Sequence, residues 1–270
     1  GDKMIEMNEL FNWDIFLQPY ELAVEDFILK MEGIKNQYHK ANLYCPIEIV
    51  SGRVKSPQSI LDKARRMNVP TALIDEKVHD IGGIRITCKY IDDVYKVAEL
   101  VRNRRDLEVL EVRDYIKNVK PNGYRSYHII IKYPLSTALG PKVINAEIQI
   151  RTNAMNFWAT AEHSLRYKYS GNIPEDIQER LTNCAGAAFN LDQEMSTIRG
   201  EITNAQRLNE IRSSMTSNIL ENIQKLHFVA KLDDMDSINR EFVDVWNSRD
   251  IDKLRAFNEK LNVLIEVYRV

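Results

Sequence analysis

"KVINAEIQIRT", residues 142–152, alternates between apolar and polar side chains from Ile144 to Arg151. Successive side chains of a β-strand point to opposite faces, so this period of two predicts a strand with one face in the core. A polar second face is either solvated or lines a site, and the residues alone leave both interpretations open. The apolar set is Ile144, Ala146, Ile148 and Ile150, and the polar set is Asn145, Glu147, Gln149 and Arg151.

Other segments on both sides of this strand predict a mixed α/β (α+β) domain. Short apolar or alternating runs predict three further strands, at 82–90, 107–115 and 126–134. Helical periodicity predicts helices at 12–35 and 93–106, and a helix that opens near Ser56 and Pro57. From residue 153 onward the pattern is helical, with expected helices at 153–171, 174–200, 203–230, 236–247 and 251–268.

The end of the chain differs in composition from the rest. No Gly or Pro follows Gly200, and no strand pattern occurs beyond it. We therefore expect a domain over 1–200 and an all-helical extension over 201–270, with a helical hairpin across "NSRD" (247–250). The apolar helical stripe of the extension either adds core to the domain or contacts another subunit. That stripe is Met215, Ile219, Ile223 and Leu226.

Composition excludes several classes of protein. With 270 residues, 44% hydrophobic residues and a net charge of −2, the chain resembles an ordinary globular protein rather than an obligate duplex-DNA binder. A local basic cleft for a phosphorylated ligand stays compatible with this balance. Three scattered cysteines (Cys45, Cys88, Cys184) indicate neither a zinc site nor a disulfide framework, which favours a cytoplasmic location. No apolar run is long enough to span a membrane.

Two carboxylates are candidates for chemistry. Asp80 in "HDIGGIR" (79–85) precedes a predicted strand, and five histidines in the chain are too few for a His-Asp phosphohydrolase site. Asp80 is thus either a single oxygen ligand for Mg²⁺ or the cap of a turn. Glu147, on the polar face of its strand, could bind a metal or accept a proton.

Two further stretches suit a nucleotide. The basic segment 53–66 carries Lys63 and Arg66 on one helix face, which fits a polyphosphate and also fits a solvated helix. "NGYRSYHIII" (122–131) offers the Tyr124 ring for stacking on a base and His128 for a phosphate, although a lone tyrosine more often covers a sheet end. Tyr127 lies on the opposite strand face and is expected to pack, and Arg125 has no assigned role.

These pieces occur in one order over residues 47–200: "GRVKS", "SILDKARR", "HDIGGIRI", "RDYIKNVKPNGYRSYHIII" and "AEIQIRTNAMNFWATAEHSLRYKYSGNIP". Together they closely resemble the synthetase domain of the RelA/SpoT family, in particular its single-domain small alarmone synthetases of the RelQ type. The resemblance implies a nucleotidyltransferase-like mixed β-sheet flanked by helices. It also implies transfer of the β,γ-pyrophosphate of ATP to the 3′-OH of GDP, GTP or GMP, which makes alarmones such as ppGpp and pppGpp for stringent-response signalling and releases AMP.

The resemblance also implies roles for residues on the ATP side of the site. Two carboxylates would hold Mg²⁺, and one of them would activate the acceptor hydroxyl. Two arginines would sandwich adenine, and a basic and hydroxyl-bearing set would contact the ATP phosphates. The two carboxylates are Asp80 and Glu147, and Glu147 would also activate the hydroxyl. Arg53 and Arg85 would lie on the two sides of adenine. The residues that would contact the ATP phosphates are Lys55, Ser59, Lys63 and Arg66.

On the acceptor side, one aromatic ring would stack on guanine and several polar groups would contact the nucleoside or its phosphates. Tyr124 is that ring, Lys120 and His128 would meet the acceptor phosphates, Gln149 and Asn156 would lie near the nucleoside, and Arg113 near the phosphates. Small members of the family look like homotetramers, so a homo-oligomer is expected. The chain shows no hydrolase region, so alarmone breakdown is not expected.

Two other functions stay open at this point. Some relatives that look like small alarmone synthetases instead pyrophosphorylate the 3′ end of tRNA. A retired synthetase fold could also serve as a non-catalytic sensor of nucleotides or single-stranded RNA. The presence of both Asp80 and Glu147 favours an enzyme over such a sensor.

Overall fold

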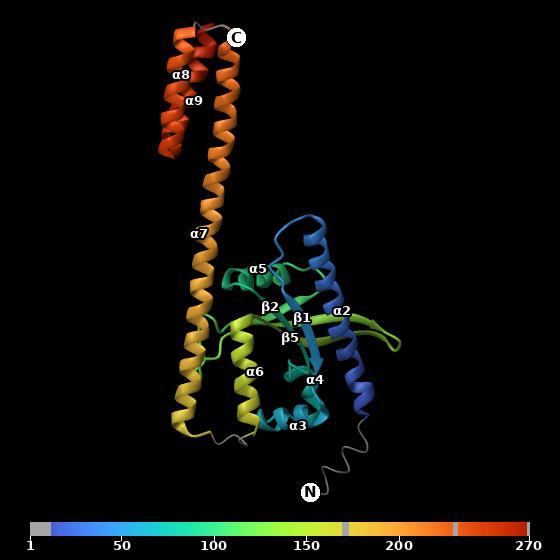
Figure 1. The fold of residues 1–270 in the computed structure, drawn as a ribbon. Helices are drawn as coiled ribbons and strands as arrows, with labels where there is room; N and C mark the ends of the chain where they lie inside the picture. The colour runs from blue at the N-terminus through green and yellow to red at the C-terminus, as the bar shows by residue number, and fades with distance from the viewer. Residues whose placement is uncertain (1–11, 169–172, 229–231, 269–270) are drawn as a thin grey trace. The chain divides into compact units, whose positions relative to one another are not determined.

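A five-stranded mixed sheet, in the order β1-β2-β5-β4-β3, forms the centre of the fold (Figure 1). The structure, a computed structural model, describes residues 12–168, 173–228 and 232–268. β2 and β5 are parallel, and the other neighbouring pairs are antiparallel. The strands are β1 (Ile49–Val54), β2 (Gly82–Cys88), β3 (Glu108–Asp114), β4 (Tyr127–Thr137) and β5 (Gly140–Thr152).

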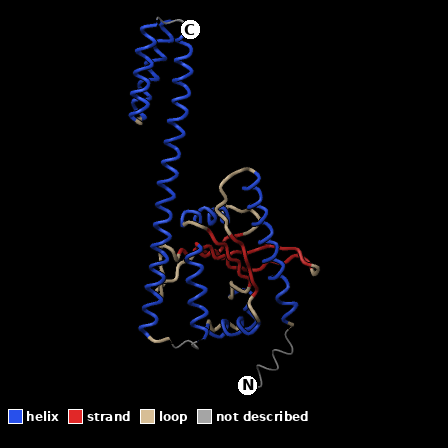
Figure 2. The backbone as a smooth tube through the Cα atoms, in the orientation of Figure 1, coloured by secondary structure: helices blue, strands red, loops and turns tan. Residues whose placement is uncertain are grey.

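Helices make up most of the remaining described chain (Figure 2). None of the helices within the described ranges is both long and apolar enough to cross a membrane. The elements are α2 (Trp13–Lys40), α3 (Pro57–Arg66), η1 (Thr71–Leu73), α4 (Ile74–Lys77), α5 (Ile91–Arg102), α6 (Asn153–Lys168), α7 (Glu175–His227), α8 (Leu232–Ser248) and α9 (Ile251–Tyr268).

The apolar face of the sheet forms the main core together with α2 and α5. Ile148 of β5 and Ile129 of β4 are fully buried in it, beside Phe27 of α2 and Val97 of α5. Tyr127 also lies in this core, with its ring 5.8 Å from that of Tyr95, which confirms its packing role. The predicted alternation of β5 therefore holds, and its opposite face is left for other side chains.

One strand at the edge of the sheet was not predicted. Residues 49–54 form β1 and pair with β2 from Ile49↔Thr87 to Val54↔Gly82. Most side chains of β1 are exposed, as is common for an edge strand. Its apolar pattern is weak for that reason, and the strand depends on backbone pairing with its neighbour.

The predicted helix boundary between 200 and 203 is also wrong. α7 runs without interruption from Glu175 to His227. Gly200 lies in its interior, and a single glycine there costs only about 1 kcal/mol. The helix formers on both sides outweigh that cost, so the backbone hydrogen bonds continue through Gly200.

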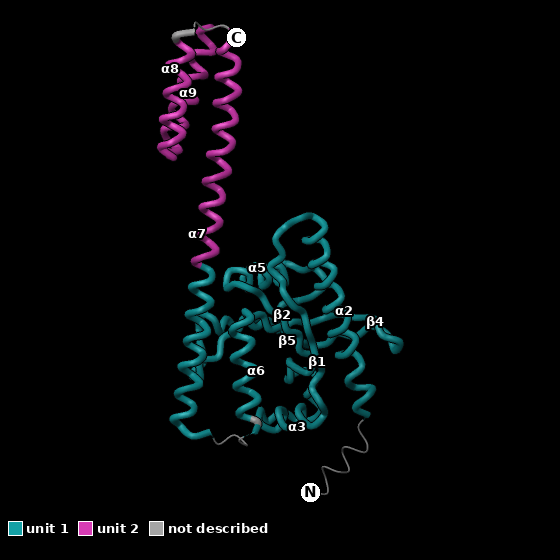
Figure 3. Tube along the Cα trace, in the orientation of Figure 1, with its two compact units in different colours: residues 1–196 teal, residues 197–270 magenta. Residues whose placement is uncertain are grey.

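The chain divides into two compact units, residues 1–196 and residues 197–270 (Figure 3). In the second unit, the stripe Ile219, Ile223 and Leu226 packs against α8 and α9 and forms a core of its own. α8 and α9 form the expected hairpin, with Arg249 in the left-handed conformation (φ 56°) at the turn. Trp246 of α8 is 40% exposed.

Candidate active site

The strand register brings polar side chains into one row across the sheet. His128 of β4 lies opposite Gln149 of β5 and Arg113 of β3, and Gln149 lies opposite Arg85 of β2. Directly paired residues share a face, so these four side chains lie on the face opposite the apolar core. Glu147, two residues before Gln149, is only 8% exposed. The polar face of β5 is therefore covered, which excludes the interpretation of a solvated strand face.

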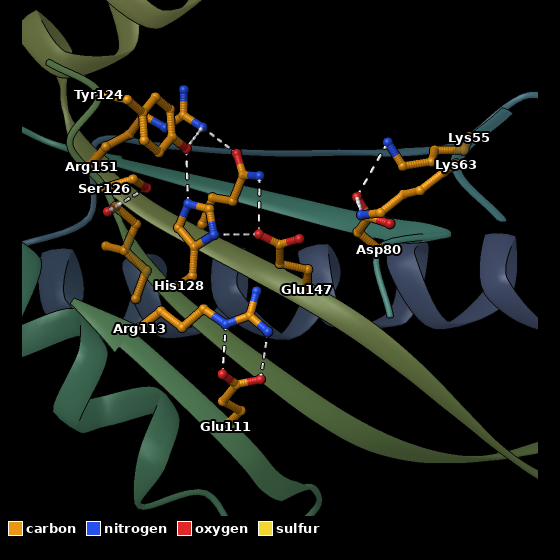
Figure 4. Close-up of polar contacts among 12 residues, drawn as sticks. Lys55, Lys63, Asp80, Glu111, Arg113, Tyr124, Ser126, His128, Glu147 and Arg151 are labelled. Carbon is orange, nitrogen blue, oxygen red and sulfur yellow. Dashed lines mark hydrogen bonds and ion pairs between the residues drawn. The ribbon is translucent and has the colours of Figure 1, made fainter. Parts of the chain in front are cut away.

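Glu147 is held by its neighbours on this face (Figure 4). One carboxylate oxygen accepts hydrogen bonds from His128 Nδ1 and, at 3.3 Å, from Gln149 Nε2. Burial alone would raise the pKa of Glu147, but the hydrogen bond and charge of His128 lower this pKa to about 2. Glu147 is thus a carboxylate at neutral pH, which suits a metal ligand. Its basicity in the free protein is low.

A chain of hydrogen bonds extends from Glu147 through His128. Arg151 Nη2 donates to Tyr124 Oη at 3.1 Å, and this hydroxyl lies 2.8 Å from His128 Nε2. Arginine can only donate, so when His128 is neutral the Tyr124 hydroxyl accepts from Arg151 and donates to His128 Nε2. His128 Nδ1 then carries the proton that it donates to Glu147. Arg151, which is 3% exposed, therefore orients this chain toward the carboxylate.

Asp80 lies just before β2 among cations. Its Oδ2 contacts Lys63 Nζ at 2.6 Å and Lys55 Nζ at 3.3 Å. Its Oδ1 is buried without a hydrogen-bond partner in the described part of the chain. A buried carboxylate oxygen without a partner is costly, and a cation would satisfy it. This environment fits a metal ligand better than the cap of a turn.

A cavity joins the two carboxylates. Within the described ranges no group of three or more His, Cys, Asp and Glu side chains could hold a metal, so a metal here would have two protein carboxylates at most. Mg²⁺ commonly takes such an arrangement and completes its shell with phosphate oxygens and water. The residues present fit that ion. The cavity is lined by Ser51, Gly52, Arg53, Lys55, Asp80, Gly83, Ile84, Arg85, Glu147 and Gln149.

Several predicted site residues do not line this cavity. Arg66 is exposed at the end of α3 and does not line the cavity. Ser59 is also exposed, with its hydroxyl 2.9 Å from that of Ser56 at the start of α3. Arg113 forms two hydrogen bonds with Glu111, at 2.6 and 2.7 Å. Asn156 of α6 has a buried Oδ1 without a partner among the described residues.

The loop before β4 places Tyr124 beside basic groups. Lys120 Nζ lies 5.1 Å from the centre of the Tyr124 ring and 4.4 Å from that of Tyr115. Burial raises the pKa of Tyr124, so its hydroxyl keeps its proton at neutral pH. The ring also packs against Trp158 and Ala185. Tyr124 is therefore fixed at both its hydroxyl and its ring.

Two arginines at or near this loop received no role of their own from the sequence. Arg151 shares the period-two face with Glu147 and Gln149, and that pattern was the signal that could have selected it. Arg125 contacts residues 60 positions later in the chain, for which no local signal exists. The ion pair Glu162–Arg166 of α6 is partly covered, since the Glu162 side chain is 12% exposed.

Comparison with known proteins gives one consistent result. A family model described as "Region found in RelA / SpoT proteins" matches residues 52–172. GTP pyrophosphokinase YjbM of Bacillus subtilis (strain 168) is 52% identical over 194 residues, which cover 72% of this chain and 92% of that protein. GTP pyrophosphokinase YwaC of the same strain is 38% identical over 193 residues, 71% of this chain and 92% of that protein.

A solved structure shows the same likeness. The crystal structure of small alarmone synthetase 1 from Bacillus subtilis bound to its product pppGpp has a TM-score of 0.68 and 52% identity. The match covers 70% of this chain and 97% of that one. The same synthetase bound to AMPCPP matches with a TM-score of 0.64 and 47% identity, over 71% of this chain and 98% of that one.

Proposed function

The chain belongs to the RelA/SpoT family, and from this premise we propose that it transfers the β,γ-pyrophosphate of ATP to the 3′-OH of GDP or GTP. The products are ppGpp or pppGpp, together with AMP. The observation that carries the proposal is the cavity in which Asp80, Glu147 and the two arginines Arg53 and Arg85 meet. Two relatives named GTP pyrophosphokinase, and a synthetase solved with pppGpp, support the same activity.

The reaction asks mainly for position and charge compensation. The acceptor 3′-oxygen attacks the β-phosphorus of ATP, the bond from that phosphorus to the α,β-bridging oxygen breaks, and AMP leaves with this oxygen. The acceptor hydroxyl gives up its proton, and Glu147, which lines the cavity, is the proposed proton acceptor. No covalent enzyme intermediate is needed.

Glu147 gains basicity if its hydrogen bond from His128 is lost. In the free protein this bond and the histidine charge keep the pKa of Glu147 near 2. We propose that the acceptor phosphates draw His128 toward themselves when GDP or GTP binds. Without this hydrogen bond one cause of the low pKa of Glu147 is removed, which improves Glu147 as a proton acceptor.

Mg²⁺ is the metal that we propose for the two carboxylates. Bound there, it would supply charge compensation for the triphosphate. Asp80 contributes an unpartnered buried oxygen to that position, and Lys55 and Lys63 hold its other oxygen. The same two lysines carry positive charge for the ATP phosphates.

The arginine pair suits an adenine base between guanidinium planes. Burial lowers the pKa of Arg85, and the charge of Arg53, which lines the same cavity, lowers it further. A polyanion that enters this cavity relieves the repulsion between them. Tyr124 is proposed to stack on guanine, with Lys120 and His128 at the acceptor phosphates and Gln149 and Asn156 near the nucleoside.

The test is a transfer assay with the full chain, Mg²⁺ and ATP labelled in its γ-phosphate. GMP, GDP, GTP and deacylated tRNA are offered separately. Label in a guanosine nucleotide is expected with GDP or GTP. Label only in tRNA would support the tRNA-modifying alternative, and RNA binding without any transfer would support the sensor. The assembly, proposed as a homotetramer, is measured by light scattering of the same sample.

A further inference from the structure

We propose that Arg125 is a positioning residue for the guanosine acceptor, because it fastens the loop that carries Tyr124 to helix α7. The inference rests on the proposed function, in which Tyr124 stacks on guanine. Arg125 would act without touching a substrate, by fixing where the Tyr124 ring stands. Its own contacts and those of the loop around it carry this assignment.

The loop depends on close contact with α7. Gly123 has φ +87°, and a Cβ atom there would lie 2.6 Å from the Cβ of Ala185. A side chain at position 123 would therefore push the loop from the helix as well as strain its backbone. The Thr182 hydroxyl also reaches the carbonyl oxygen of Asn122, at 3.4 Å. Residues 122–124 thus lie directly on the helix surface.

Arg125 connects this loop to helix α7. Its Nη1 donates to the Gly123 carbonyl at 3.1 Å and to the Ala185 carbonyl at 3.5 Å. Its guanidinium carbon lies 4.4 Å from the centre of the Phe189 ring, one helical turn beyond Ala185. One planar cation therefore connects the residue before Tyr124 to two turns of α7, through a hydrogen bond on each side and a cation–π contact.

The helix surface is itself held in place. Trp158 Nε1 of α6 donates to the Leu181 carbonyl of α7 at 2.8 Å. Trp158, Ala159 and Ala185 form a small buried cluster, and Tyr124 packs against it. Arg125 thus fastens the loop to a support that α6 also contacts. Without the guanidinium, the loop loses one of its attachments to α7, and the Tyr124 ring is held less closely in position.

The test compares Arg125→Met with the wild-type full chain, and Arg105→Met, at an exposed arginine, is the matched control. Loss of charged hydrogen bonds to the loop should raise the KM for GDP by about tenfold. The KM for ATP and kcat should not change, since uniform weakening of acceptor binding affects only the acceptor KM. Hydrogen exchange of amides 122–126 should be faster in Arg125→Met alone.

Two more variants extend the test. Arg125→Lys keeps a cation over Phe189 but lacks the planar fork, so a smaller rise in the KM for GDP is expected, and this variant decides the matter if Arg125→Met does not fold. The double variant Arg125→Met with Phe189→Ala should raise the KM for GDP by less than the product of the two single effects, because both substitutions remove the same cation–π contact. An unchanged KM for GDP, or an equal rise in both KM values, would overturn the role of Arg125.

Failure of the proposed function would be recognised separately. If the wild-type chain transfers no pyrophosphate, the dissociation constant for GDP, measured by calorimetry, is compared between the variants in place of the KM. Weaker GDP binding by Arg125→Met would then still support the positioning role, and unchanged binding would overturn it. A wild-type chain that neither transfers pyrophosphate nor binds GDP would overturn both proposals.

Discussion

Tyr124 offers two functions that substitution can separate. Its hydroxyl connects Arg151 to His128, and its ring is the proposed platform for guanine. Tyr124→Ala removes both and should weaken GDP binding by about 1–3 kcal/mol, the usual contribution of base stacking. Tyr124→Phe keeps the ring and breaks the hydrogen-bond chain, so it should lower kcat with little change in the KM for GDP. Steady-state kinetics with varied GDP check both. Equal rises in KM for the two variants would contradict the separate role of the hydroxyl.

Asp192 makes the stability depend on pH. It is buried on α7 and accepts a hydrogen bond from Thr152 Oγ1 at 2.5 Å. Burial raises the pKa of Asp192 to about 6, although Thr152 partly offsets the rise. This pKa lies above the value of an unfolded Asp, near 3.9, so the protonated form stabilises the fold below about pH 4 and that contribution is lost as the pH rises through 6.

Asp192→Asn should remove this dependence. At pH 7.5 the free energy of unfolding should exceed that of the wild type by about 1–2 kcal/mol, and at pH 4 the two should be close. Urea unfolding followed from pH 4 to 7.5 measures the difference. Glu194→Gln, an exposed change on the same helix, is the control and should show no such trend. A constant difference across this pH range would refute the assignment.

At the scale of secondary structure, Gly200 weakens α7, and neither its backbone conformation nor its surroundings require a glycine. A Cβ atom there would meet nothing within 4 Å, and its φ is not positive. Gly200→Ala should therefore stabilise the helix by about 0.5–1 kcal/mol. Gly140, in the β4–β5 turn, also has open space but a φ of +103°. The same change at Gly140 should destabilise the protein. Thermal unfolding of both variants would show opposite shifts, and shifts of the same sign would contradict this account.

The elements also show how far the sequence could predict the structure. β5 follows from its alternation and β4 from a short apolar run, because each strand has a buried face that a slip in register would expose. β1 could not be predicted in this way, since an edge strand with exposed side chains leaves no alternation. The helix break at Gly200 was inferred from local propensity, which the cooperative backbone of a 53-residue helix overrides.

The site follows the same logic. Asp80 and Glu147 could be selected as candidates from the sequence, but the sequence alone left a turn cap open for Asp80 and a solvated strand face open for Glu147. The bond from Arg151 to Tyr124 depends on the register of two strands, and the bonds of Arg125 depend on a helix 60 residues away. Contacts of this kind have no local pattern, so the sequence could not predict these hydrogen bonds.

At the scale of the whole molecule, the two units have separate cores. Leu226 is fully buried in the second unit, among Ile219, Leu254 and Leu261. Leu226→Ala should destabilise that unit by about 2–5 kcal/mol, through lost burial and a residual cavity. The KM values and kcat should stay unchanged, since every residue of the proposed site lies in residues 1–196. Circular dichroism on heating, combined with kinetics, checks both expectations.

The matched change for this experiment is Ile148→Ala, in the core directly behind the site. Ile148 is fully buried and follows Glu147 on β5. This variant should lose both stability and kcat, because the strand that holds Glu147 becomes less rigid. A fall in kcat for Leu226→Ala as large as that for Ile148→Ala would contradict the independence of the two cores.

The measurement that tests the central claim most directly is the fate of the label and the AMP balance in one reaction. The full chain receives GDP, Mg²⁺ and ATP labelled in its β- and γ-phosphates. We predict that label enters a guanosine tetraphosphate and that one AMP is released for each product molecule. Glu147→Gln should abolish both signals while the protein stays folded. Label that stays in ATP, or AMP released without a labelled guanosine product, would contradict the account.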